Sequence, residues 1–205
     1  MRTLVLGALL LVAGSRDAAA QTAAPSPWSF SGYAYTYILP DEPNYVQPTV
    51  TADRKRLHLE ARFNYEDRDT GSVWAGLNFS GGDAVSWELT PMLGGIFGQT
   101  SGLAPGYRGS IAWRALEFYS EGEAMFDAVS SEDSFLYNWS ELTLSPVDWL
   151  RFGLVTQRTR AYQSDRVVQR GLLVGASYRT LDMAVYVFNP DDSKPIVVIT
   201  FGVSF

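Results

Sequence analysis

The sequence contains no cysteine, one histidine and only two lysines among its 205 residues. Without a thiol the chain forms no disulfide, no thiolate metal site and no lipid-modified cysteine. A transition-metal site would need carboxylates for nearly every ligand, because His58 is the single imidazole. We therefore expect no metal and no cofactor. The lysines, Lys55 and Lys194, are far fewer than a soluble domain of this length normally carries.

Long apolar runs are also missing, with one exception at the N-terminus. "MRTLVLGALLLVAGSRDAAAQ" has a basic start at Arg2, a short apolar run, and an A-x-A site that ends at Ala20. This order is typical of a secretory signal peptide. The apolar run is shorter than the roughly 20 residues that a membrane-spanning helix needs. The sequence predicts a cleaved leader over residues 1–20 and a short periplasmic tail over 21–27.

Positive charge is scarce relative to negative charge. Removal of the leader takes away Arg2, Arg16 and Asp17, so the net charge changes from -6 to -7. Proteins that bind nucleic acid carry a clustered basic surface, and this balance argues against that class. Aromatic residues make up 14% of the chain and include six tryptophans. Such rings are frequent where a protein meets a membrane interface.

Apolar and polar residues alternate with a period of two through the rest of the chain, as side chains on the two faces of a strand do. The clearest segment is 56–66, "RLHLEARFNYE". Its expected apolar face is Leu57, Leu59, Ala61, Phe63 and Tyr65. Its expected polar face is Arg56, His58, Glu60, Arg62 and Asn64. A strand with lipid on one side and a polar lumen on the other requires this pattern. The pattern recurs at 73–79, 150–154 and 172–178.

Turn signals between these segments divide the chain into ten expected strands. They are 28–39, 46–66, 71–80, 84–97, 107–127, 133–145, 148–160, 167–179, 182–189 and 195–205. An even number places both termini at the periplasmic end of a barrel. Outward loops would then be 40–45, 81–83, 128–132, 161–166 and 190–194, which carry much of the acidic charge. The phase of 107–127 changes at 113–115, so eight or twelve strands remain open as alternatives.

The chain stops on an aromatic residue within an alternating segment, "PIVVITFGVSF". With the leader, the period-two strands and the terminal "FGVSF", it resembles the small bacterial outer-membrane β-barrel proteins. The resemblance implies an all-β fold, namely an antiparallel up-and-down transmembrane β-barrel over residues 28–205, in the bacterial outer membrane. It also implies that Phe205 is the signal read by the barrel-insertion machinery. No narrower family is indicated.

Charged residues on the polar faces are expected to form a network in the lumen, because an unpaired buried charge is very costly. The expected members are Arg56, His58, Glu60, Arg62, Glu88, Glu117, Glu121, Glu141 and Arg151. Pairs that meet across the lumen would plug it, whereas charges of one sign along each wall would leave a water path. The excess of glutamate predicts that any leak prefers cations.

Two further sets of residues are candidates for catalysis or binding. His58 and Glu60 form a pair suited to general-base catalysis, but no serine lies in a recognisable nucleophile motif, so a satisfied lumen histidine is favoured. Arg158, Arg160 and Arg166 would lie near the outer rim. Their guanidinium groups suit the phosphates of lipopolysaccharide, and solvated loop charge is an equal alternative.

Three functions follow in order of preference. The first is a structural or interaction barrel with a charge-filled lumen, acidic outer loops and a protein partner bound through those loops. The second is a narrow, cation-leaning, porin-like pore. The third is an outer-membrane hydrolase that uses His58, although we expect no enzymatic activity. In each case the surroundings are outer-membrane lipid and lipopolysaccharide.

Overall fold

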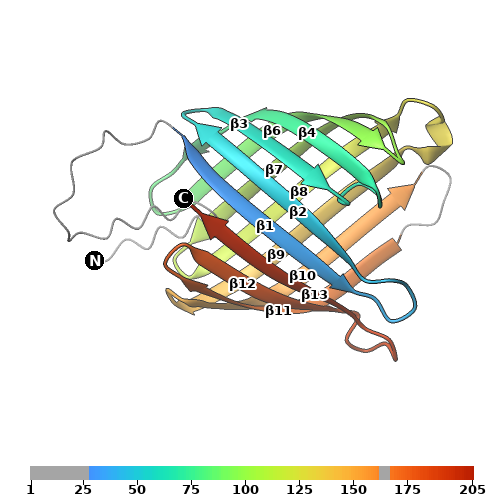
Figure 1. The fold of residues 1–205 in the computed structure, drawn as a ribbon. Helices are drawn as coiled ribbons and strands as arrows, with labels where there is room; N and C mark the ends of the chain where they lie inside the picture. Colours follow the sequence, from blue (N-terminus) through green and yellow to red (C-terminus); the bar gives the residue numbers. More distant parts are fainter. Residues whose placement is uncertain (1–27, 162–166) are drawn as a thin grey trace.

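The alternating segments form one antiparallel sheet that closes on itself (Figure 1). The computed structural model describes residues 28–161 and 167–205, so the predicted leader and tail lie outside the described residues. The strands are β1 (Ser29–Ile38), β2 (Tyr45–Arg54), β3 (Leu57–Phe63), β4 (Thr70–Leu77), β5 (Phe79–Gly81), β6 (Ser86–Gly98), β7 (Gly102–Trp113), β8 (Leu116–Asp127), β9 (Phe135–Val147), β10 (Leu150–Ala161), β11 (Val167–Tyr178), β12 (Leu181–Phe188) and β13 (Ile196–Ser204). One short 3-10 helix, η1 (Ser131–Asp133), follows β8.

Two strand pairings close the sheet into a ring. One joins the first and last strands, and the other joins two strands that have a short strand between them in sequence. β1 pairs with β13, and β4 pairs with β6. β5 continues the register of β4 along β6, because Gly76 lies opposite Met92 and Phe79 opposite Leu89. The interruption lies opposite Pro91, which has no backbone N–H to give to the ladder. Twelve strands therefore form the ring, and β5 is an extension outside it. In the part of the chain that the structure describes, no helix is long and apolar enough to cross a membrane.

The predicted closed antiparallel barrel is confirmed, but the expected ten strands are wrong, and twelve was the correct alternative. Expected strand 46–66 is two strands joined by the turn Lys55–Arg56. Expected strand 107–127 is two strands joined by the turn Arg114–Ala115. The second turn coincides with the phase change seen in the sequence. Neither turn contains the Gly, Asn, Asp or Pro that normally marks a two-residue hairpin.

The two ends of the barrel differ in the length of their connections. The terminus end, where Phe205 lies beside Phe30, has the turns 55–56, 82–85, 114–115, 148–149 and 179–180. The loop end has longer connections, which include 39–44, 64–69, 128–134 and 189–195 (Figure 1). The additional hairpin at 55–56 reverses the direction of the strands that follow it. The segment 81–83, expected in an outward loop, therefore lies at the terminus end.

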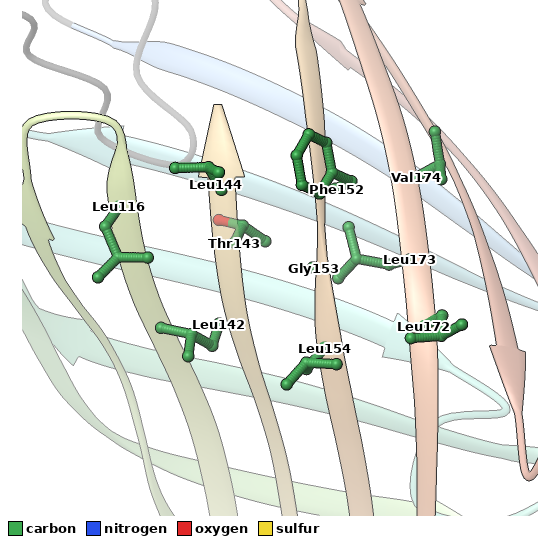
Figure 2. A pocket seen from close by; sticks show the side chains of 10 residues that line it. All are labelled: Leu116, Leu142, Thr143, Leu144, Phe152, Gly153, Leu154, Leu172, Leu173 and Val174. Carbon is green, nitrogen blue, oxygen red and sulfur yellow. The ribbon is translucent and has the colours of Figure 1, made fainter. Parts of the chain in front are cut away.

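The outer wall is apolar and the inner wall is mixed. Val73, Leu93 and Phe201 point outward with 54%, 57% and 44% of their surface exposed. Along β13 the inward Val198 and Thr200 are buried, as the period of two predicts. An apolar groove of about 460 Å³ lies over β8 to β11 on the outer wall, lined mainly by leucines (Figure 2). This is the surface that lipid tails require of a barrel.

Bulky side chains fill much of the lumen toward the loop end. One buried cluster contains Tyr37, Trp139, Val155, Leu173, Ala184, Tyr186, Phe188 and Val198. A second contains Trp74, Met92, Ile96, Ala104 and Met125. The sequence predicts a lumen filled by charge, and the structure instead divides it between charged and apolar side chains. A twelve-stranded ring is wider than the eight strands that ordinary side chains fill, so aromatic bulk is needed to fill it.

The turn Lys55–Arg56 yields a prediction about stability. Lys55 has φ 55°, a left-handed conformation that Asn tolerates better than a long side chain does. We expect Lys55→Asn to raise the free energy of unfolding by about 1 kcal/mol, measured by urea unfolding of the refolded protein. Lys194→Asn, in an exposed loop, is the control and should change little. An unchanged or lower free energy for Lys55→Asn would show that the turn is not strained.

Candidate functional site

The main polar feature is an ion-paired network in the lumen, built on the inward face of β3. His58, Glu60 and Arg62 are two residues apart on this strand, so all three side chains point inward and are buried. His58 Nε2 lies 3.0 Å from Glu60 Oε2, and Glu60 Oε1 accepts a hydrogen bond from Arg62 Nε. His58 Nδ1 lies 2.8 Å from Asp53 Oδ1 on β2. One strand thus supplies a continuous file of ionisable groups.

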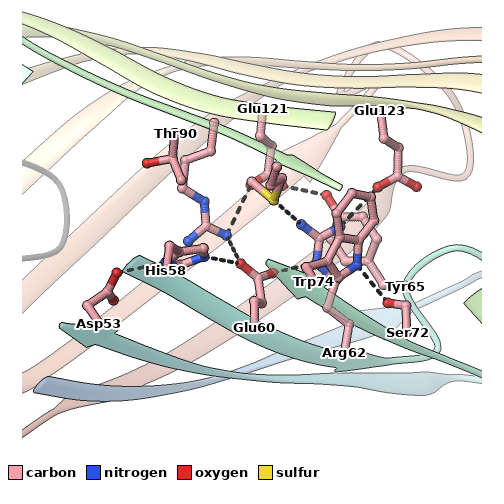
Figure 3. Close-up of polar contacts among 12 residues, drawn as sticks. Asp53, His58, Glu60, Arg62, Tyr65, Ser72, Trp74, Thr90, Glu121 and Glu123 are labelled. Carbon is pink, nitrogen blue, oxygen red and sulfur yellow. Dashed lines mark hydrogen bonds and ion pairs between the residues drawn. The ribbon is translucent and has the colours of Figure 1, made fainter. Parts of the chain in front are cut away.

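The opposite side of the network comes from β7 and β8. Arg62 Nη1 donates to Glu123 Oε2 at 3.0 Å, and Arg108 Nη2 lies 2.8 Å from Glu60 Oε2. Figure 3 shows Glu121 and Glu123 pointing from one side of the lumen toward Glu60 and Arg62 on the other. β3 and β8 are separated in the ring by β4, β6 and β7. The pairs therefore meet across part of the lumen.

Aromatic rings enclose the central guanidinium. Arg62 Cζ lies 4.4 Å from the ring centroid of Trp74 and 4.2 Å from that of Tyr65. The hydroxyl of Tyr65 donates to Glu121 Oε1 at 2.6 Å, and Trp74 Nε1 donates to Ser72 at 2.9 Å. Rings on both faces of a guanidinium leave its N–H edge free for carboxylates.

Two glycines make room for the Trp74 indole. A Cβ at Gly94 on β6 would lie 2.5 Å from the indole, and a Cβ at Gly106 on β7 would lie 2.9 Å from it. Contacts shorter than 3.0 Å force a displacement, and the Trp74 ring has little room to move because it also stacks on Arg62. Gly94 and Gly106 therefore hold the indole in place over the guanidinium.

A second, smaller ion pair lies toward the terminus end. Arg151 on β10 forms two hydrogen bonds with Asp182 on β12, at 2.5 and 2.7 Å. The guanidinium passes over Gly175 on β11, where a Cβ would lie 2.7 Å from Arg151 Cζ. These side chains line a lumen cavity of about 160 Å³ together with Tyr33 and others.

The predicted network residues fall into three groups. His58, Glu60, Arg62 and Glu121 are brought together in the network. Glu117, Glu141 and Arg151 line the 160 Å³ cavity. Glu141 accepts hydrogen bonds from Trp139 and Tyr186, at 2.8 and 3.0 Å. Glu88 is half-buried on β6, with Thr90 two residues along on the same face.

Two side chains lie elsewhere than the sequence predicts. Arg56 does not face the lumen: it lies in the exposed turn 55–56, with its guanidinium 5.6 Å from the ring centroid of Phe79. Tyr65 does not face outward, because Asn64 has φ 58° and turns the next residue inward. Arg151 forms its ion pair with Asp182, which is not among the residues predicted for the network.

Several network residues were not found from the sequence. Asp53 lies on β2, which the sequence did not separate from β3 at the turn 55–56, so its inward face was not recognised. Arg108 and Glu123 lie on β7 and β8, which the sequence did not separate at the turn 114–115. The period-two pattern breaks at each of these turns, and that break could have revealed both hairpins. Glu66 follows the phase change at Asn64, and its carboxylate accepts a hydrogen bond from Ser72 at 2.6 Å.

The remaining predicted residues lie at the two ends. The backbone N–H of Phe205 donates to the carbonyl of Phe30 at 2.8 Å, and its side chain is 78% exposed. Arg158 points outward on β10 near the loop end and is exposed. Arg160 also belongs to β10, but the structure does not describe its side chain. Arg166 lies outside the described residues. The described residues contain no group of three or more His, Asp or Glu suited to a metal ion.

No family model and no curated protein matches the sequence. Solved structures match in fold. A KdgM porin is 9% identical with a TM-score of 0.60, and the match covers 85% of this chain and 99% of the porin. A KdgM porin in complex with disordered oligogalacturonate is 11% identical with a TM-score of 0.60, covering 86% and 99%. OccK5 (OpdH) of Pseudomonas aeruginosa is 9% identical with a TM-score of 0.47, covering 88% and 67%.

The closed ring and these matches define the class: the chain has the fold of the outer-membrane porin barrels. At 9 to 11% identity the matches concern the fold alone.

The glycines beside Trp74 provide a prediction with a matched control. Gly94→Ala places a methyl group against the indole, so we expect the free energy of unfolding to fall by about 1–3 kcal/mol. Gly95→Ala is the control, because a Cβ there meets nothing within 4 Å. Urea unfolding followed by tryptophan fluorescence compares the two variants. Equal free energies of unfolding for the two variants would contradict the claim that Gly94 makes room for the Trp74 indole.

Proposed function

We propose that the protein is a narrow outer-membrane channel that prefers cations. The observation that carries the proposal is the file of ionisable side chains along β3. It starts at Asp53 and His58 near the terminus end, continues through Glu60 and Arg62, and reaches Glu66 near the loop end. A barrel that serves only as a scaffold does not require a charged file from one end to the other.

Apolar side chains could have filled the whole lumen, and they do fill the wall opposite the charged strands. Buried ion pairs are commonly no more stabilising than well-packed apolar residues of similar size. The cluster around Trp139 and Phe188 shows that the barrel accommodates such packing. Retention of charge on β3, β7 and β8 therefore supports a role in passing charged or hydrated solutes.

Carboxylates outnumber guanidinium groups on the inner wall. The inward carboxylates are Asp53, Glu60, Glu66, Glu88, Glu117, Glu121, Glu123, Glu141 and Asp182. The inward guanidinium groups are Arg62, Arg108 and Arg151. One oxygen of Glu66 and one of Glu123 are buried without a hydrogen-bond partner among the described residues. A wall with excess negative charge attracts cations and repels anions.

In the proposed channel the network would be the constriction. Ion pairs cross the lumen between β3 and β8, and apolar clusters occupy the loop-end half. Conductance should therefore be small. The same crossing pairs favour a second candidate, a closed scaffold whose acidic loops bind a protein partner.

A catalytic role for His58 gains no support from the geometry. Each ring nitrogen of His58 lies beside a carboxylate, Asp53 on one side and Glu60 on the other. A general base needs a ring nitrogen directed at a hydroxyl or at a water that attacks substrate, and both positions here are taken.

Three further features support an outer-membrane location. The outer wall is apolar, the fold is that of the porin barrels, and the first 20 residues read as an export signal. In this setting Phe205 would act as the assembly signal. Arg158, Arg160 and Arg166 would lie where lipopolysaccharide phosphates are found, and these assignments belong to the same proposal.

Ion selectivity tests the proposed channel. The refolded protein in a planar bilayer under a KCl gradient should show small steps with a reversal potential of the sign for potassium preference. Glu121→Gln removes an inward charge whose carboxylate accepts hydrogen bonds from the hydroxyls of Tyr65 and Tyr119 and lies 3.9 Å from Arg108, so the preference should fall. Glu132→Gln, on the exposed helix η1, is the control and should leave it unchanged. Anion preference, or silence from correctly folded protein, would reject the channel and favour the closed scaffold.

A further inference from the structure

The terminus end carries a ring of exposed basic side chains that the channel does not use. We call Arg54, Lys55, Arg56, Arg114 and Arg179 the basic rim; all five are exposed. Four of them lie over aromatic rings. Arg54 is 5.6 Å from the centroid of Trp28, Arg114 is 4.8 Å from that of Trp113, and Arg179 is 5.3 Å from that of Tyr178. The fourth is Arg56 over Phe79.

Backbone conformation distinguishes the basic rim from the loops at the other end. Lys55, Arg114 and Arg179 have φ of 55°, 57° and 56°. Left-handed positions normally hold Gly, Asn or Asp, because a long side chain is strained there. The loop end follows that rule, with Asn64, Asp69 and Asn189 at its left-handed positions. Long side chains therefore occupy strained left-handed positions only at the terminus end, and all three of them are basic. This pattern indicates that the positive charge has a role there.

Ion pairing differs between the two ends in the same way. At the loop end Arg68 pairs with Glu42, Arg170 with Asp191, and Lys194 with Asp41. Within residues 28–161 and 167–205, no member of the basic rim forms an ion pair with a carboxylate. In the part of the chain that the structure describes, the positive charge of the basic rim is therefore available to a ligand.

The spacing of the left-handed basic residues describes a ring. Lys55 lies between β2 and β3, Arg114 between β7 and β8, and Arg179 between β11 and β12. Four strands of the ring separate each of these turns from the next. A protein partner needs a contiguous patch on one side, whereas a lipid leaflet surrounds a barrel.

Exposed rings mark the level of the membrane interface at this end. Trp113, Trp149 and Tyr178 have 50%, 59% and 68% of their surface exposed, and all lie in or beside the terminus-end turns. Amphipathic rings occupy the headgroup level of a bilayer. The guanidinium groups stacked on such rings lie at the same level, where lipid phosphates are found.

We propose that the basic rim binds the phosphate groups of anionic phospholipids in the leaflet at the terminus end of the barrel. Guanidinium groups bind phosphate through paired N–H donors, and the Lys55 ammonium contributes a point charge. The occupants are ordinary headgroups arranged around the barrel, and the inference does not depend on whether the lumen conducts.

Spin-labelled lipids test this directly. The refolded full chain in phosphatidylcholine vesicles should immobilise spin-labelled phosphatidylglycerol about threefold more than spin-labelled phosphatidylcholine. The preference should weaken in about 0.5 M salt, because the charges are exposed. Lys55→Asn with Arg114→Asn and Arg179→Asn removes three of the five charges of the basic rim, so it should lower the preference by more than half. These changes also put a favoured residue at each left-handed position.

Two further variants keep the test decisive. Arg68→Asn with Arg170→Asn and Lys194→Asn removes the same charge from the loop end and should keep the preference. Arg114→Lys with Arg179→Lys retains charge and should keep most of it. Equal immobilisation of the two lipids by folded wild-type protein would overturn the proposal and leave an acidic protein as the partner. So would a preference that the three terminus-end Asn substitutions leave unchanged.

Discussion

The burial of Arg62 is the interaction on which the arrangement of the lumen depends. Its guanidinium lies between the rings of Trp74 and Tyr65 and contacts Glu60 on its own strand and Glu123 across the lumen. A buried charge is tolerated only when opposite charges and hydrogen bonds surround it. Carboxylates from β3 and β8 are therefore drawn to one point, and Arg108 offsets part of the negative charge that they bring.

Volume is the second constraint, because twelve strands enclose more space than ordinary side chains fill. Large rings occupy that space, and glycines on neighbouring strands receive them. Gly94 and Gly106 receive Trp74, and Gly175 lets Arg151 reach Asp182. The charged wall and the aromatic wall thus fill the same lumen in two ways, and in the proposed channel ions would pass along the charged wall.

The sequence was sufficient for the fold class and for the faces of most strands. Period-two alternation predicts the outward Leu57, Val73 and Phe201 correctly, because lipid and lumen impose different chemistry on alternate residues. The strand number could not be read, since the turn at Lys55 lacks the residues that mark turns. The network was predicted only in part. Contacts such as Arg62 with Glu123 join residues 61 positions apart, and no local pattern reveals which inward charges meet.

The most direct measurement is the single-channel conductance of Arg62→Met beside that of the wild-type protein, after an unboiled gel shows that both are folded. Methionine keeps the length of the side chain and removes the charge that holds Glu60 and Glu123 together. Release of these carboxylates should open the constriction, so larger steps that remain cation-selective are predicted. Identical conductance in the two proteins would contradict the claim that the Arg62 network controls the lumen.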